Sequence, residues 1–343
     1  MATSEKTEKQ IRRRNVALSS SILAFTAFLW GMGFVSQRAG MEHVGPFFFS
    51  GARMILGAAV IALTIVVMNT IQKARRGKPE AAGEHTAEPS QAPATVRELL
   101  KGGMACGAIL FFAGNSQQVG IVFTTASKAG FLTALYIVLV PILGIFLKHK
   151  THWNTWVSVL IAAGGLYFLC ITEGLHIKIG DLVILIGSIG WASHILVIDH
   201  FVSKFGQTDV IRLCALQFLF AGIFAFICAP FADPFFVKES LTAEALQAVM
   251  VSLLYAGIVS SGIGFTLQAV GQRYANPSAA AILMSLESVF AVIGGMLILH
   301  EKMSGREILG CGLMFLAVIL AQLPVGGNET PTAAEGITDT SAS

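Results

Sequence analysis

Two charged residues lie inside long apolar stretches of the sequence, where they could do chemistry. Glu287 falls near the middle of the stretch 278–299, and Arg53 lies early in the stretch 47–69. In hydrocarbon such a charge costs several kcal/mol unless it is paired, hydrated or neutralised. Glu287 could carry a proton or bind an amine, or it could be a protonated acid that ties two helices together. Arg53 could attract an anionic group, or it could snorkel to the interface or link two helices.

Polar amides and aromatic rings form a second group of candidates. The amides interrupt apolar stretches, and each could bond a neighbouring helix, at about 1 kcal/mol, or face a cavity. For Gln217 the helix link is the preferred interpretation. Rings within membrane helices serve more often in packing or in interface belts than in binding sites. The amides are Asn115, Gln117, Gln118, Gln217 and Gln268, and the rings are those of Trp30, Phe34, Tyr136, Trp191 and Tyr255.

The sequence gives little support for other kinds of site. His194 and His200 are six positions apart and do not share a helix face, so no metal site with Asp199 is expected. The five cysteines lack the spacing of a metal or redox motif and are interpreted as packing residues. No phosphate-binding loop with a lysine is present, and Glu287 has no acidic companion within any apolar stretch. We therefore expect no cofactor, no bound metal, no nucleic-acid partner and no enzymatic activity.

Ten apolar stretches must position these residues. The chain has 343 residues, of which 54% are hydrophobic and 13% are charged, whereas about a quarter of the residues of a soluble domain are charged. Its mean hydropathy is +0.71, and a stretch of about 20 apolar residues is long enough to span a bilayer as a helix. The sequence therefore predicts an all-α polytopic membrane protein with ten transmembrane helices. The expected spans are 17–37, 47–69, 101–121, 127–147, 153–172, 180–199, 208–229, 246–271, 278–299 and 305–323.

Polar segments at the ends and in one connection set the expected topology. Residues 1–16 are basic, and residues 70–100 and 324–343 hold too few large apolar side chains to fold, so both are expected to be disordered. With the N-terminus in the cytoplasm, sixteen Lys and Arg residues fall inside and six fall outside. The positive-inside rule then places both termini in the cytoplasm, which an even number of spans requires.

The two halves of the chain, 17–172 and 180–323, resemble each other and hold five expected spans each. Because five is odd, the second half enters the membrane from the opposite side, which gives the inverted repeat typical of secondary transporters. Small residues should let the helices approach closely. These are Gly57, Gly164, Gly165, Gly187, Gly190, Gly294, Gly295, Gly310 and Gly312. The matching positions are Trp30-Gly31 with Trp191-Ala192, Val119-Gly120 with Val270-Gly271, and Ala129 to Thr133 with Ala281 to Ser285.

Four features of these repeats carry a family resemblance: the run Trp30-Gly31-Met32-Gly33-Phe34, Arg53, the run Ser285-Leu286-Glu287-Ser288-Val289-Phe290-Ala291, and Glu301. Together they resemble the EamA repeat, which defines the ten-helix branch of the drug/metabolite transporter (DMT) superfamily. The resemblance covers residues 17–323, with 70–100 as an insertion. Two positions depart from the family pattern: Ser288 stands where a proline is frequent, and the apolar Leu135 stands where the first repeat would match Glu287.

The resemblance implies a multi-pass inner-membrane transporter that exports or exchanges a small metabolite, amino acid-like or amphipathic and drug-like, by alternating access. The implied partners are membrane lipid, a small-molecule substrate and, if Glu287 titrates, protons. A passive facilitator or channel of the same fold is the alternative, and a membrane-embedded enzyme is a distant one. The predicted cavity residues are Trp30, Phe34, Asn115, Gln118, Tyr136, Trp191, Tyr255, Gln268 and Ser285, with Glu287 and Arg53 as intramembrane charges.

Overall fold

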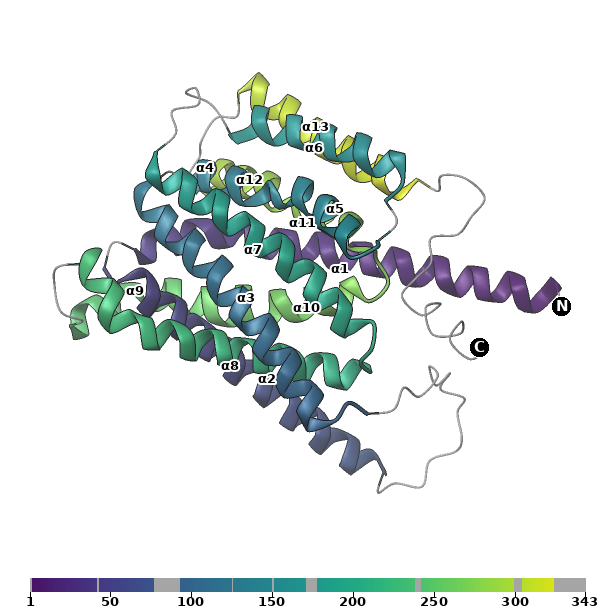
Figure 1. Cartoon of the computed structure of the whole chain (residues 1–343), viewed down its shortest axis with the longest axis horizontal. Helices are drawn as coiled ribbons and strands as arrows, with labels where there is room; N and C mark the ends of the chain where they lie inside the picture. Colours follow the sequence, from purple (N-terminus) through teal and green to yellow (C-terminus); the bar gives the residue numbers. More distant parts are fainter. Residues whose placement is uncertain are drawn as a thin grey trace.

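The computed structural model describes residues 2–41, 43–76, 93–124, 126–149, 151–170, 178–237, 242–298 and 304–323. Within these ranges the chain forms ten helical rods and no strand, which confirms the all-α polytopic prediction (Figure 1). Seven of the helices are long and apolar enough to cross a membrane. The elements are α1 (Ala2–Gly40), α2 (Pro46–Arg76), α3 (Val96–Phe123), α4 (Ala126–Ala134), α5 (Tyr136–Phe146), α6 (Trp153–Cys170), α7 (Ile179–Val202), α8 (Gln207–Ala232), η1 (Asp233–Phe235), α9 (Ala243–Leu254), η2 (Tyr255–Gly264), α10 (Phe265–Gln272), α11 (Pro277–Met284), α12 (Glu287–Ile298) and α13 (Gly305–Gln322).

Several helices run beyond the apolar stretches that predict them. α1 begins at Ala2 rather than at residue 17, and α2 continues to Arg76. These ends remain helical because the backbone hydrogen bonds continue from the apolar part. The expected disordered connection is therefore shorter than 70–100. Residues 77–92, the tail 324–343 and Glu301 lie outside the described residues.

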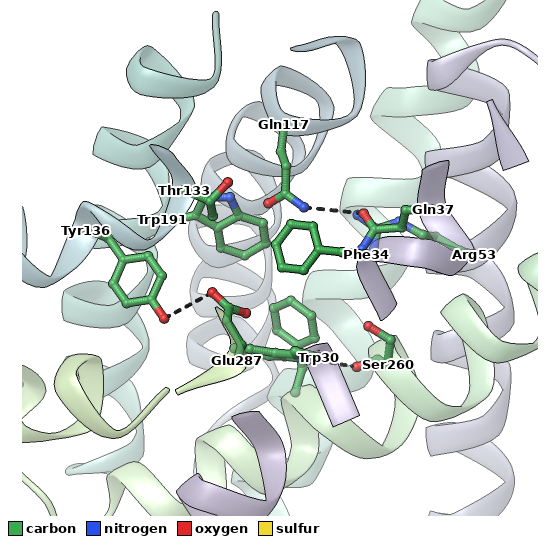
Figure 2. A pocket seen from close by; sticks show the side chains of 11 residues that line it. Trp30, Phe34, Gln37, Arg53, Gln117, Thr133, Tyr136, Trp191, Ser260 and Glu287 are labelled. Carbon is green, nitrogen blue, oxygen red and sulfur yellow. Dashed lines mark hydrogen bonds between the residues drawn. The ribbon is translucent and has the colours of Figure 1, made fainter. Parts of the chain in front are cut away.

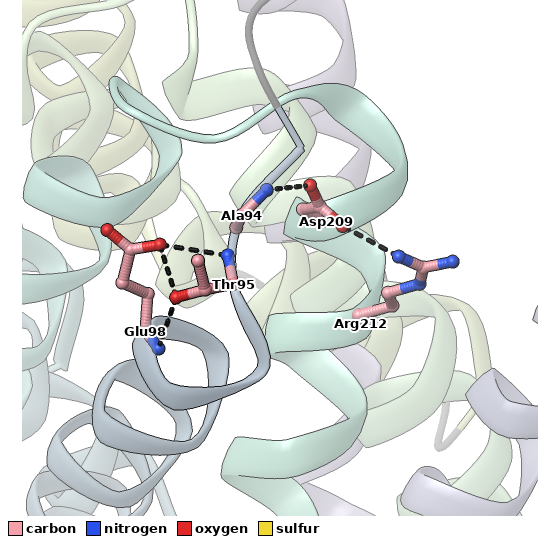
Figure 3. A network of polar contacts seen from close by, with 5 residues as sticks. All are labelled: Ala94, Thr95, Glu98, Asp209 and Arg212. Carbon is pink, nitrogen blue, oxygen red and sulfur yellow. Dashed lines mark hydrogen bonds and ion pairs between the residues drawn. The ribbon is translucent and has the colours of Figure 1, made fainter.

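The start of α3 is fixed by side-chain contacts that the composition of this connection does not suggest. Thr95 and Glu98 form a capping box, in which each side chain accepts the other's backbone N–H. The carboxylate of Asp209, on α8, accepts the N–H of Ala94 at 2.9 Å and also bonds Arg212 at 2.9 Å (Figure 3). The chain is thus tied to α8 where it leaves the connection and enters α3.

The two repeats pack against each other in an inverted manner. α6 lies antiparallel to α13, and α2 lies antiparallel to α8. At the first pair, the Asn154 amide at the start of α6 donates to the carbonyls of Leu320 and Leu323 at the end of α13. At the second pair, the contacts run in opposite directions along the two helices, Gly51 against Phe226 and Ile55 against Gly222.

The remaining helices also pack against helices of the other repeat. α3, of the first repeat, packs on α7 and α8, while the continuous segment α9–η2–α10, of the second repeat, packs on α1 and α2. α4 and α5 pack on α7, and α11 and α12 pack on α1 (Figure 1). Each of these contacts between the repeats therefore has a counterpart with the repeats exchanged, as expected for an inverted repeat.

The fourth and ninth spans are broken at corresponding places. α4 ends at Ala134 and α5 begins at Tyr136, while α11 ends at Met284 and α12 begins at Glu287. Leu135 occupies the first break, so the predicted unbroken helix over 127–147 is wrong at this point. Neither break contains glycine or proline, and Pro141 lies further on, inside α5. The breaks place the first residues of two half-helices, Tyr136 and Glu287, in the buried interior.

Candidate functional site

A pocket with a cavity volume of about 40 Å³ lies between the repeats, beside the two helix breaks. It takes residues from both repeats: α1, α2, α3, α4 and α5 of the first, and α7, η2, α10 and α12 of the second. Figure 2 shows aromatic rings in its centre, with Tyr136 and Glu287 toward one side and Arg53 and Gln37 toward the other. The lining residues are Trp30, Phe34, Gln37, Arg53, Gln117, Thr133, Tyr136, Trp191, Ser260, Phe265 and Glu287.

One side of the pocket carries an acid and a phenol. The Tyr136 hydroxyl lies 3.4 Å from the Glu287 carboxyl and donates a long hydrogen bond to it. Both side chains are buried, Tyr136 at 3% and Glu287 at 4% exposure. Glu287 is also the first residue of α12, where the free backbone N–H groups and the helix dipole favour a carboxylate. Among the residues that the structure describes, the carboxyl is thus held by a long hydrogen bond and not by an ion pair.

The other side of the pocket carries a guanidinium. Arg53 is 2% exposed, so it does not snorkel to the surface. Its Nε and Nη2 atoms have no hydrogen-bond partner among the described residues. Nearby, the Gln117 amide donates to the Gln37 side-chain oxygen at 3.3 Å, which links α3 to α1 (Figure 2). These donors and acceptors make this side strongly polar and incompletely satisfied.

Aromatic rings separate the two polar sides. Trp30 and Phe265 have ring centroids 4.6 Å apart, and Trp191 lies 5.9 Å from Phe265. The indole Nε1 of Trp30 donates to the Ser260 carbonyl at 3.1 Å. That carbonyl belongs to η2, a ten-residue π-helix, where the wider turn alters the backbone bonding; π-helical turns often mark functional sites. The rings provide an apolar wall suited to the hydrocarbon part of a ligand.

The structure brings six of the predicted site residues together in this pocket: Trp30, Phe34, Arg53, Tyr136, Trp191 and Glu287. The other five do not line it. Asn115 bonds the Phe111 carbonyl, Tyr255 bonds the Leu29 carbonyl and Ser285 bonds the Ile282 carbonyl, so each makes a helix contact. Gln118 and Gln268 are buried elsewhere in the bundle.

Five lining residues were not among the predicted cavity residues. Gln37 lies seven positions after Trp30 and three after Phe34, so all three share one face of α1, and this spacing could have identified it. Thr133 likewise lies three positions before Tyr136. Gln117 had been noted only as a polar interruption. Ser260 and Phe265 have no such signal, because the π-helix between them changes the periodicity.

His194, one of the residues considered for a metal site, lies directly behind the pocket wall, with its ring centroid 6.2 Å from that of Trp191 and 6.0 Å from that of Phe265. His194 is fully buried, and its Nε2 pairs with the Gln217 side-chain oxygen at 2.9 Å, which links α7 to α8. The helix-link interpretation of Gln217 agrees with this contact. Among the described residues, no group of three or more His, Cys, Asp or Glu side chains could hold a metal ion.

A buried pocket at the interface of two inverted five-helix repeats, beside broken helices, is the arrangement of a membrane transporter. The comparisons agree, because a model of the EamA-like transporter family matches residues 18–171 and 178–323, one match for each repeat. The chain belongs to this family, which confirms the resemblance seen in the sequence, and it is a multi-pass membrane transporter.

Similar proteins cover nearly the whole chain. An "Uncharacterized transporter" of Archaeoglobus fulgidus is 27% identical over 88% of this chain and 85% of its own length. "Uncharacterized transporter YoaV" of Bacillus subtilis is 23% identical over 85% and 92%, and "Uncharacterized inner membrane transporter YedA" of Escherichia coli K12 is 25% identical over 86% and 87%. A solved crystal structure with 16% sequence identity covers 89% of this chain and 96% of its own, with a TM-score of 0.64, and shows the same fold.

Proposed function

We propose that this chain is a secondary transporter of a small metabolite and that the pocket between the repeats is its substrate-binding site. The supporting observation is the pocket itself, which combines an acid, a guanidinium and aromatic rings in the buried interior. Its cavity volume of about 40 Å³ holds a few water molecules, so a metabolite would enter only when the helices around the pocket move apart.

Alternating access follows from the way the pocket is built. Its lining comes from both repeats, so a rocking motion of one repeat against the other would open it first to one side and then to the other. The Trp30–Ser260 contact joins the two repeats at the pocket and would have to be exchanged during such a motion. The substrate is carried while the pocket is closed to both sides.

The proposed orientation places both termini in the cytoplasm of an inner membrane. The start of α1 and the end of α13 lie at the same end of the bundle (Figure 1). Among the described residues, the opposite end carries four basic residues, Arg38, Lys128, Lys178 and Arg306. The terminal end carries more, besides those at the start of α1: Lys73, Arg75, Arg76, Arg97, Lys101, Lys148, Lys204, Arg212 and Arg273. The excess of basic residues at the terminal end supports the cytoplasmic assignment through the positive-inside rule, and export or exchange of the metabolite follows from the family resemblance.

Glu287 is the proposed coupling residue. A neutral carboxyl can enter the buried pocket at low cost, and it can release its proton when the pocket fills with water on the other side. Tyr136 supplies a phenol that can hydrogen-bond either the neutral or the ionised carboxyl, at a separation of 3.4 Å. The acid therefore keeps a partner in both states, which a coupling group needs.

The test uses purified protein in proteoliposomes. A thermal-shift screen of amino acids, nucleosides and cationic drugs first identifies a ligand that stabilises the protein. Uptake of that ligand is then measured with and without an imposed proton gradient. We expect Glu287→Gln to bind the ligand and to exchange it, but to lose accumulation driven by the proton gradient. Glu244→Gln, which alters an exposed acid at the start of α9, is the matched control and should behave as the wild type.

Accumulation by Glu287→Gln equal to that of the wild type, with the same pH dependence, would show that Glu287 is a structural helix tie. A wild-type protein that equilibrates the ligand by counterflow but never accumulates it in a proton gradient would favour the alternative function, a passive facilitator with the same binding site.

A further inference from the structure

Arg53 is the least satisfied charged group in the pocket. Its side chain is 2% exposed, and Nε and Nη2 have no hydrogen-bond partner among the described residues. The guanidinium lies over Gly114 of α3, where an added Cβ would sit only 3.5 Å from Nη2. The absence of a side chain at Gly114 leaves room for the guanidinium beside the pocket, and Figure 2 shows it next to Gln37.

A buried guanidinium without a partner is energetically unfavourable. Arginine stays charged in proteins, so it cannot lower this cost by losing its proton. The acid of the pocket, Glu287, is bonded to Tyr136 and makes no ion pair with Arg53 within the part of the chain that the structure describes. A structural tie between helices would use up these donors, and they are unused. These two donors are therefore available to a partner that arrives with the ligand.

The donor arrangement selects the chemistry of that partner. The planar fork of a guanidinium matches the two oxygens of a carboxylate or of a phosphate. Only one basic side chain lines the pocket, and the acid on the opposite side would repel a dianion, so a single negative charge is favoured. The neighbouring Gln37 and Gln117 amides can donate to the outer lone pairs of a bound carboxylate. The rings of Trp30 and Trp191 would then contact an apolar body.

We propose that Arg53 is the carboxylate-binding subsite of the pocket, so that the substrates are small organic monocarboxylates with an apolar part. This inference rests on the proposed function and names the substrate class for the same site. It requires that cationic compounds without a carboxylate bind poorly, because they would bring a second positive charge to an unpaired one.

The experiment measures ligand binding through tryptophan fluorescence. Trp30 and Trp191 line the pocket, and Trp153 and Trp156 lie on α6, which contributes nothing to the lining. Replacing Trp153 and Trp156 by Phe therefore leaves a signal from the pocket alone. The probes are butyrate, hexanoate and 3-phenylpropionate, each paired with its uncharged amide, together with inorganic phosphate. The amide matches the carboxylate in shape and lacks only its charge.

We expect the carboxylates to bind better than their amides in the wild type, and inorganic phosphate to bind less well than the carboxylates. Arg53→Gln should weaken carboxylate binding about 10- to 100-fold, because a charge-assisted bidentate contact is lost, and should leave amide binding unchanged. Arg53→Lys keeps the positive charge but loses the planar pair of donors, so its affinity for carboxylates should lie between those of the wild type and of Arg53→Gln. Lys101→Gln removes an exposed positive charge on α3 and should match the wild type.

Three results would overturn the subsite: equal affinities for carboxylates and amides in the wild type, no binding of any carboxylate, or carboxylate affinity that survives in Arg53→Gln. If Arg53→Gln does not fold, the wild-type preference and the Arg53→Lys loss decide the question. Transport of an uncharged or cationic compound, with Arg53→Gln unaffected, would reject the carboxylate subsite while the proposed transporter function stands. If no compound is transported and none quenches the tryptophan fluorescence, both the carboxylate subsite and the proposed transporter function are rejected.

Discussion

Two glycines of α13 should respond in opposite ways to the same substitution. A Cβ added at Gly310 would lie 2.7 Å from the carbonyl oxygen of Gly165 and 2.7 Å from the backbone nitrogen of Leu169, on α6. A Cβ added at Gly312 would meet nothing within 4 Å. The close atoms at Gly310 belong to the backbone of α6, so no side chain can rotate away to make room. Gly310→Ala must therefore push α6 and α13 apart.

The expected magnitudes follow from two opposing effects. Alanine in a helix interior is favoured over glycine by about 0.5–1 kcal/mol, and this gain applies at both positions. Forced overpacking costs about 1–3 kcal/mol, and it applies only at Gly310. Gly312→Ala should therefore be neutral to slightly stabilising, and Gly310→Ala should be less stable than Gly312→Ala by about 1–3 kcal/mol.

The assay is thermal unfolding of the purified variants in one detergent, with apparent melting temperatures compared between the two substitutions. The first repeat offers a second matched pair on α6, since a Cβ at Gly165 would lie 3.0 Å from the Gly310 carbonyl and one at Gly164 would meet nothing within 4 Å. We expect a smaller difference in the same direction between Gly165→Ala and Gly164→Ala, because the contacts at Gly165 are longer than those at Gly310. Equal shifts within both pairs would refute the close approach of α6 and α13.

Two further predictions concern the ends of the bundle. The Asp233 carboxylate, at the end of α8, accepts the N–H groups of Phe47 and Phe48 at 2.9 and 2.8 Å and so caps α2. Asp233→Ala should therefore lower the free energy of unfolding by about 1–2 kcal/mol, measured by thermal or denaturant unfolding. Unchanged stability would contradict this cap. In a cysteine-free background, Arg97→Cys should be shielded from an impermeant thiol reagent in intact cells and Lys178→Cys should react, because these exposed residues lie at opposite ends of the bundle. Labelling of the first cysteine alone would reverse the proposed orientation.

The number and order of the spans could be predicted because membrane thickness imposes a length on each apolar stretch. The ends could not, because a helix continues into water as long as its backbone bonds do, and α2 does so as far as Arg76. The start of α3 was open to prediction, since Thr95 and Glu98 have the spacing of a capping box. The break at Leu135 was not, because it contains neither glycine nor proline.

Close helix packing was predicted more broadly than the structure supports. Of the small residues named for it, Gly187 and Gly190 lie tightly against α3, and Gly165 lies tightly against α13. Gly164 and Gly312 face open space instead. Composition identifies glycines that permit close approach, but only the rotation of each helix about its axis decides which of two near neighbours meets the partner. That rotation depends on the whole interface rather than on local sequence.

The site residues also divide into those that the sequence could identify and those that it could not. Charges and large rings in apolar stretches are conspicuous, so Arg53, Glu287 and the tryptophans could be selected from the sequence. Asn115, Gln118 and Gln268 were selected on helix membership alone, and all three are buried without lining the pocket. An amide costs far less to bury than a charge, so its presence in a span says little about which side of the helix lines a cavity.

The two repeats place different chemistry at their helix breaks. Matching the sequence motifs sets Leu135 against Glu287, which leaves the acid without a polar counterpart at that position. The structure begins α5 at Tyr136 and α12 at Glu287, so the phenol and the acid are the first residues of the two half-helices and meet at 3.4 Å. Arg53 has no such match: it is the eighth residue of α2, and the eighth residue of α8 is the buried Cys214. The inverted fold is thus shared between the repeats while the charges are not, and the pocket is consequently polarised, which a symmetric cavity could not be.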